Sequence, residues 1–109
     1  MAFDEGLAQR IRELLASTPG IEEKKMFGGL CFLDRGNMVG GIVGSELMMR
    51  VGAEKYDEAL NEPHVRKMDF TGRSMRGMIY VGEAGIEADE NLEKWLKKGL
   101  AFTQNLPAK

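Results

Sequence analysis

The most informative stretch of this chain is Lys24-Lys25-Met26-Phe27-Gly28-Gly29-Leu30-Cys31-Phe32. Its apolar residues fall on both faces of an extended chain, which predicts a buried β-strand over Lys24–Leu33. Two adjacent glycines weaken a strand interior and usually mark a bulge or a close approach of another backbone. We therefore expect this segment to be the central strand of an antiparallel sheet, with Gly28 and Gly29 shaping it for close packing.

The rest of the chain supplies helices and four further strands. Apolar residues three and four positions apart predict a first helix, which Thr18-Pro19-Gly20 ends. A short helix is expected at about Ala53 to Leu60, and a last helix is expected to begin at Asp89 as its N-cap and to bury Trp95. The other strands are predicted at Met38–Ile42, Leu47–Val51, Val65–Phe70 and Gly77–Val81.

The predicted element order is helix, three strands, helix, two strands, helix. This order indicates one α+β domain over residues 1–109, with a five-stranded antiparallel sheet and three helices. Because both faces of the sheet are expected to be apolar, both need cover. We expect either helices on both faces or a homodimer that buries the remaining face.

The composition limits what the chain binds and where it works. With 109 residues and a formal net charge of −2, it fits one compact domain and is no general binder of polyanions. Cys31 is the sole cysteine and lies in an apolar strand, which predicts a buried thiol in a reducing compartment. The first 15 residues carry charges in place of a secretory signal core. We expect a cytoplasmic protein.

The sequence offers no pattern typical of catalysis or of cofactor binding. His64 is the sole histidine, and no serine lies in a Gly-x-Ser-x-Gly turn. One histidine and one cysteine do not make a standard zinc site. The paired glycines lack the lysine and the following helix of a phosphate-binding loop. We predict no catalytic residue, no metal, no cofactor and no enzymatic activity.

Six side chains are candidates for contact with a partner. The segment Pro63–Tyr80 is the most basic in the chain, and its cations could reach phosphates or an acidic protein: Arg66, Lys67, Arg73 and Arg76. Arg50 lies inside a predicted strand, where a charge needs a partner, and a structural ion pair is the default interpretation. Met48, on the same strand face, is a candidate for an interface because methionine adapts to binding surfaces.

Several motifs in order along the chain resemble the N-terminal domain of the TfoX/Sxy family. The motifs are Lys25-Met26-Phe27-Gly28-Gly29, Gly36-Asn37-Met38, Arg50-Val51-Gly52, Met68-Asp69-Phe70-Thr71-Gly72-Arg73, Met75, Gly77 and Leu92…Trp95…Gly99-Leu100. The resemblance covers nearly the whole chain, from about Leu7 to Pro107. The resemblance implies an α+β fold similar to secretion-chaperone-like domains, which often dimerise. The bacterial founders regulate natural competence together with a cyclic-AMP receptor protein. They carry a second, helical domain, and we expect this chain to be a stand-alone member without it.

These observations support one main hypothesis and two alternatives. The main hypothesis is a small, non-enzymatic interaction domain, homodimeric, that regulates transcription through a protein partner in the transcription machinery. The first alternative is direct nucleic-acid binding through the basic segment from Arg66 to Arg76. The second is a small-ligand pocket beside Phe27–Gly29.

Overall fold

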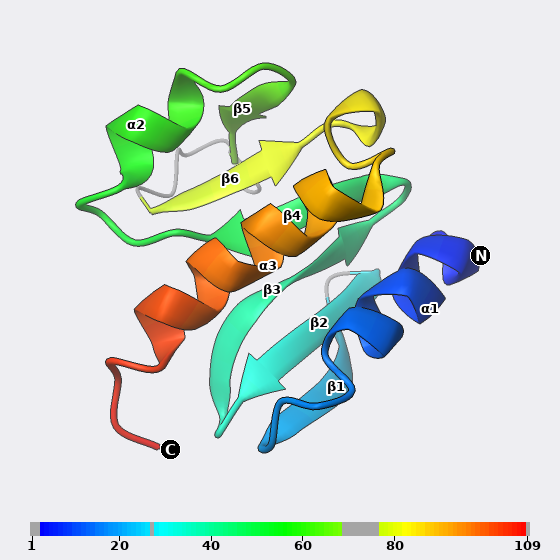
Figure 1. Ribbon diagram of the computed structural model, residues 1–109, viewed down its shortest axis with the longest axis vertical. Coiled ribbons are helices and arrows are strands. Elements are labelled where there is room, and N and C mark those ends of the chain that lie inside the picture. The colour runs from blue at the N-terminus through cyan, green and yellow to red at the C-terminus, as the bar shows by residue number, and fades with distance from the viewer. Residues whose placement is uncertain (1–2, 27, 69–76, 109) are drawn as a thin grey trace.

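The computed structural model describes residues 3–26, 28–68 and 77–108. Three helices and a six-stranded antiparallel sheet make up this part of the chain, in the strand order β1-β2-β3-β4-β6-β5 (Figure 1). The elements are α1 (Glu5–Leu14), β1 (Ile21–Met26), β2 (Gly29–Asp34), β3 (Asn37–Val43), β4 (Glu46–Arg50), α2 (Tyr56–Leu60), β5 (Val65–Lys67), β6 (Met78–Val81), the 3-10 turn η1 (Glu83–Gly85) and α3 (Asp89–Thr103). The α+β class is confirmed, but the predicted count of five strands is wrong.

The sixth strand arises because the chain makes a hairpin turn at Gly28, and Gly29 begins the next strand. β1 pairs antiparallel with β2, with Met26 opposite Gly29, so the chain reverses between these two residues. Gly28 has a φ of +75°, in the left-handed region that tight hairpin turns require. The prediction of one central strand over Lys24–Leu33 is therefore wrong, and β1 is an edge strand.

The expectation of a close backbone approach holds at the second glycine of the pair. A Cβ at Gly29 would lie closer than 3.0 Å to the carbonyl oxygen of Ile42 on β3. A Cβ at Gly41, on β3, would likewise lie closer than 3.0 Å to the carbonyl oxygen of Leu30 on β2. Real side chains do not tolerate such a distance, so these positions require glycine.

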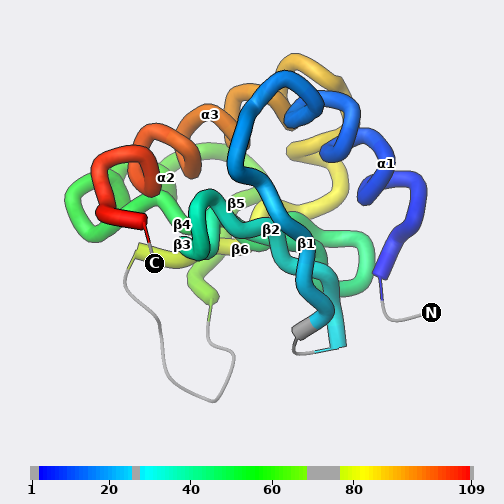
Figure 2. The backbone as a smooth tube through the Cα atoms, turned by 90° about the horizontal axis from the view of Figure 1, so that it is seen from below, coloured from blue at the N-terminus to red at the C-terminus, as the bar shows by residue number. Residues whose placement is uncertain are grey.

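All three helices cover the same face of the sheet (Figure 2). The expectation of helices on both faces is thus wrong. The core on this face includes Ile42, Leu47 and Val81 from the strands and Trp95, which is 2% exposed, from α3. The prediction of Trp95 as a core anchor is confirmed. Gly99 lets α3 lie close to the sheet, because a Cβ there would lie 2.9 Å from Val39 Cγ1.

The opposite face, called the helix-free face below, carries a second apolar cluster. Cys31, Met48, Met68, Met78 and Tyr80 are buried there, and Met38 and Val43 pack against them while partly exposed. One row of directly paired residues crosses all six strands of this face: Lys24, Cys31, Gly41, Met48, Tyr80 and Arg66. Both faces of the sheet are therefore apolar, as expected.

Several predicted boundaries move by a few residues. Asp4 caps α1 by accepting a hydrogen bond from the Leu7 amide, at 3.2 Å. The N-cap of α3 is Ala88, and Asp89 instead pairs with Arg10 of α1, at 2.9 Å. α2 is shorter than predicted, and β5 ends at Lys67, while residues 69–70 of its predicted range lie outside the described residues. No helix among the described residues is long and apolar enough to cross a membrane.

Candidate functional site

The predicted basic segment places its first cation against a carboxylate of the same chain. The guanidinium of Arg66 binds both carboxylate oxygens of Glu46, with Nη2 at 2.6 Å from Oε1, and lies 4.6 Å from the centre of the Tyr80 ring. This ion pair lowers the pKa of Glu46. Lys67 is exposed, and Arg73 and Arg76 lie outside the described residues. The positive charge of Arg66 is therefore largely neutralised at the surface where a phosphate would bind.

The two candidates on β4 lie in different surroundings. Met48 is 1% exposed within the second cluster, so a partner on this face would reach its neighbours Met38 and Val43 first. The guanidinium of Arg50 lies 4.9 Å from the centre of the Phe102 ring and donates to the carbonyl of Met38 at 3.5 Å. Within the described residues, these two contacts take the place of the expected ion pair. A role of either residue in binding stays a prediction.

The described family-motif residues lie at the β1–β2 hairpin and on α3. Lys25 lies on the edge strand β1, opposite Leu30, and Gly28 and Gly29 form the hairpin described above. Phe27 lies outside the described residues, as does the side chain of Met26. The buried Trp95 ring has the ammonium groups of Lys94 and Lys98 near it, at 5.0 and 5.7 Å from its centre.

The single histidine is exposed and the single cysteine is buried. His64 is exposed in the turn before β5, with a φ of +66°, and its carbonyl accepts a hydrogen bond from the Gly82 amide at 2.8 Å. Cys31 is buried, and burial raises the pKa of its thiol. In the described ranges, no three His, Cys, Asp or Glu side chains come together as metal ligands would.

A network of buried polar groups ties the end of α3 to the hairpin between β2 and β3. The Thr103 hydroxyl donates to Asp34 Oδ2 at 2.9 Å, and the Asp34 side chain is 3% exposed. Arg35 donates to Asp34 Oδ1 at 3.2 Å and to the Thr103 carbonyl at 2.9 Å. Asn37 reaches the Pro107 carbonyl at 3.0 Å. The bonds from Arg35 to the Thr103 carbonyl and from Asn37 to the Pro107 carbonyl hold the C-terminal segment against this hairpin.

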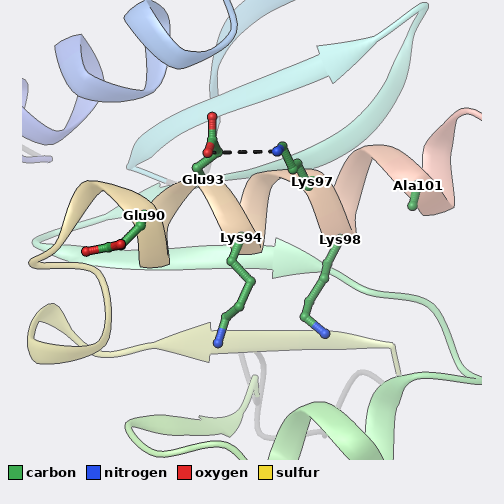
Figure 3. Close-up of a pocket in the computed structure, with 6 residues that line it drawn as sticks. All are labelled: Glu90, Glu93, Lys94, Lys97, Lys98 and Ala101. Carbon is green, nitrogen blue, oxygen red and sulfur yellow. Dashed lines mark ion pairs between the residues drawn. The ribbon is translucent and has the colours of Figure 1, made fainter.

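The exposed face of α3 carries a shallow, charged depression (Figure 3). Lys97 points toward Glu93, at 3.8 Å, and Lys94 forms an ion pair with Glu62, at 3.0 Å. All the residues that line it project from this one helix: Glu90, Glu93, Lys94, Lys97, Lys98 and Ala101. Paired charges on a single helix face are typical of a solvated surface.

A deeper cavity of about 600 Å³ lies between the loop after β4 and the C-terminal end of α3. Its walls include Val51, Gly52, Phe102 and Leu106. Sequence reasoning placed a pocket beside Phe27–Gly29 and missed this one. In the sequence, one wall of this cavity is visible as Arg50-Val51-Gly52 before a short helix. Only the packing of α3 brings Phe102 against that wall.

Comparison with known proteins identifies the family. The family model of the TfoX N-terminal domain matches residues 13–103. The chain belongs to the TfoX N-terminal domain family. The matched range contains the hairpin around Gly28, the whole sheet and α3 up to Thr103. No curated protein and no solved structure matches the chain.

Proposed function

We propose that this TfoX N-terminal domain is a non-enzymatic interaction module that regulates transcription through a protein partner. Membership of the family supports a TfoX-like role. The observation that carries the proposal is the helix-free face, because, in the part of the chain that the structure describes, a sheet with apolar side chains on both faces has its helices on only one of them. Domains normally bury each apolar sheet face against another layer.

The helix-free face has the composition of an adaptable contact surface. Met38 and Val43 are partly exposed and rest on a buried layer that contains Met48, Met68 and Met78. Methionine is flexible and polarizable, and it is used often where one surface must fit varied partners. A partner seated on Met38 and Val43 would extend the second cluster outward.

We propose that a second copy of the chain occupies this face. A two-fold interface joins the same patch on both subunits, so Met38 and Val43 of each copy would be buried against the other copy. The charges at the rim are balanced, which avoids repulsion between copies: Glu46 pairs with Arg66, and Glu22 and Lys24 lie on this face of β1 with opposite sign.

Light scattering during size-exclusion chromatography tests the dimer. We expect a mass of twice the chain mass of 12.1 kDa for the wild type and a monomer for Val43→Asp. Ala84→Asp is the matched control, because Ala84 is exposed on η1, outside the second cluster, and should stay dimeric. A monomeric wild type at every concentration, or an unchanged Val43→Asp dimer, contradicts this arrangement.

The regulatory partner is tested by adding a cyclic-AMP receptor protein and then promoter DNA to the same experiment. We expect a shift in mass with the protein and none with DNA alone at low salt. The Arg66–Glu46 pair supports this expectation, because a phosphate would have to displace a bound carboxylate. Binding of DNA alone that weakens steeply with salt would instead favour the nucleic-acid alternative.

A further inference from the structure

The cavity beside α3 has apolar walls and a positive rim. The loop after β4 and the C-terminal half of α3 lie next to each other (Figure 1). Val51 is buried in the wall, and Phe102 and Leu106 are partly exposed toward it. Its volume of about 600 Å³ falls within the range of small-molecule sites in proteins.

Glycine at position 52 creates the close contact that shapes the wall. Gly52 has a φ of +87°, and a Cβ there would lie 2.5 Å from Cδ1 of the Phe102 ring. The loop backbone therefore rests on the ring in a way that other residues would prevent. Arg50 lies 4.9 Å from the centre of the same ring, which adds positive charge behind this wall.

The lysine at the rim differs from its neighbours on α3. Lys94 and Lys97 have carboxylate partners at 3.0 and 3.8 Å. Lys98, among the described residues, has only the Trp95 ring, and it points from α3 toward the side of α2 (Figure 3). Lys55 lies on the same rim, in a loose pair with Glu58 at 3.9 Å.

We propose that this cavity binds a small organic anion with an apolar body and a single acidic group. The apolar body would lie against Val51, Phe102 and Leu106, and the acidic group would pair with Lys98 and Lys55. Glu54 on the same rim reduces the positive charge, which favours one negative charge over a polyphosphate. This site is independent of the helix-free face.

Fluorescence titration with anilinonaphthalene sulfonate tests the site on the full folded chain, because that probe joins an aromatic body to one sulfonate. We expect one probe per chain, with Lys98→Gln weakening the affinity by about threefold to fivefold, as expected for one partly solvated charge pair. The neutral analogue N-phenylnaphthylamine should bind wild type and Lys98→Gln equally. Lys97→Gln is the charge control and should leave both affinities unchanged, because Lys97 does not line the cavity.

A large side chain placed in the cavity tests whether the probes bind there, independently of the charge of Lys98. We expect Ala101→Trp to abolish binding of both probes, while Lys97→Trp, on the same exposed helix, preserves it. Circular dichroism of each variant checks that it is folded. In the wild type, amide NMR shifts on adding the probe should concentrate at Gly52, Ala101 and Leu106. Unchanged binding to a folded Ala101→Trp, or shifts concentrated elsewhere, would overturn the proposal.

Discussion

Replacing Thr103 by valine should destabilise the domain more than the small change in side-chain shape suggests. Valine has nearly the same shape and is also β-branched, so helix propensity and packing change little. The change removes the hydroxyl that donates to Asp34 at 2.9 Å. The Asp34 side chain is 3% exposed, so water does not easily replace the lost donor.

The expected cost follows from the charge of the acceptor. A hydrogen bond to a charged group contributes about 1.5–3 kcal/mol, and its loss at a buried carboxylate falls in the same range. Asp34 keeps the Arg35 Nε donor, at 3.2 Å, so we expect a loss of about 2 kcal/mol. At a urea slope of about 1.5 kcal/mol per M, the unfolding midpoint would fall by about 1.3 M.

Urea unfolding followed by the fluorescence of the buried Trp95 measures this change. Thr103→Ser keeps the hydroxyl and should lose less stability than Thr103→Val. In an Asp34→Asn background, the cost of Thr103→Val should fall to about 1 kcal/mol, the value for a neutral hydrogen bond. A loss below about 0.5 kcal/mol for Thr103→Val, or an equal loss in both backgrounds, would refute the reasoning.

Three other outcomes are expected. Gly41→Ala should prevent stable folding, because its Cβ would meet the Leu30 carbonyl. Gly44→Ala, at φ +62° in open space, should cost about 1–2 kcal/mol in urea unfolding. Glu46→Gln should cost less than about 1 kcal/mol at neutral pH, because the pair with Arg66 is partly exposed. The pKa of Glu46 is lowered on folding, so this stabilisation is present above the ordinary carboxyl pKa of 4.5 and is lost as pH falls through the lowered value. A difference in stability between wild type and Glu46→Gln that stays constant down to pH ~2 would count against this. Cys31 should react with a disulfide reagent slowly when folded and rapidly in urea; fast labelling of the native chain would mean the thiol is accessible.

Local patterns predicted the helices well and one hairpin badly. The spacing of Leu7 and Ile11 corresponds to the buried side of α1, and Trp95 is buried as expected. The Gly28-Gly29 pair was misread because a glycine in a turn and a glycine in a strand interior look alike in sequence. Only the pairing of β1 with β2 shows that Gly28 turns the chain while Gly29 admits the β3 backbone.

The candidate contact residues show the same limit. The positive charge of Arg66 was evident from its position in a basic segment, but its partner Glu46 lies two strands away in the sheet, with β6 between. The environment of Arg50 depends on Phe102, which is more than 50 residues away in the chain. Pairings across a sheet or between a strand and a distant helix have no local signature.

The α+β class, the family and the apolar character of both sheet faces follow from composition, periodicity and ordered motifs. Contacts in the folded chain were needed for the rest. They place a hairpin turn at Gly28, put the three described helices on one face, and form the cavity between Gly52 and Phe102. The physical reason is that chain reversal, layer placement and cavity shape follow from contacts between segments far apart in the chain.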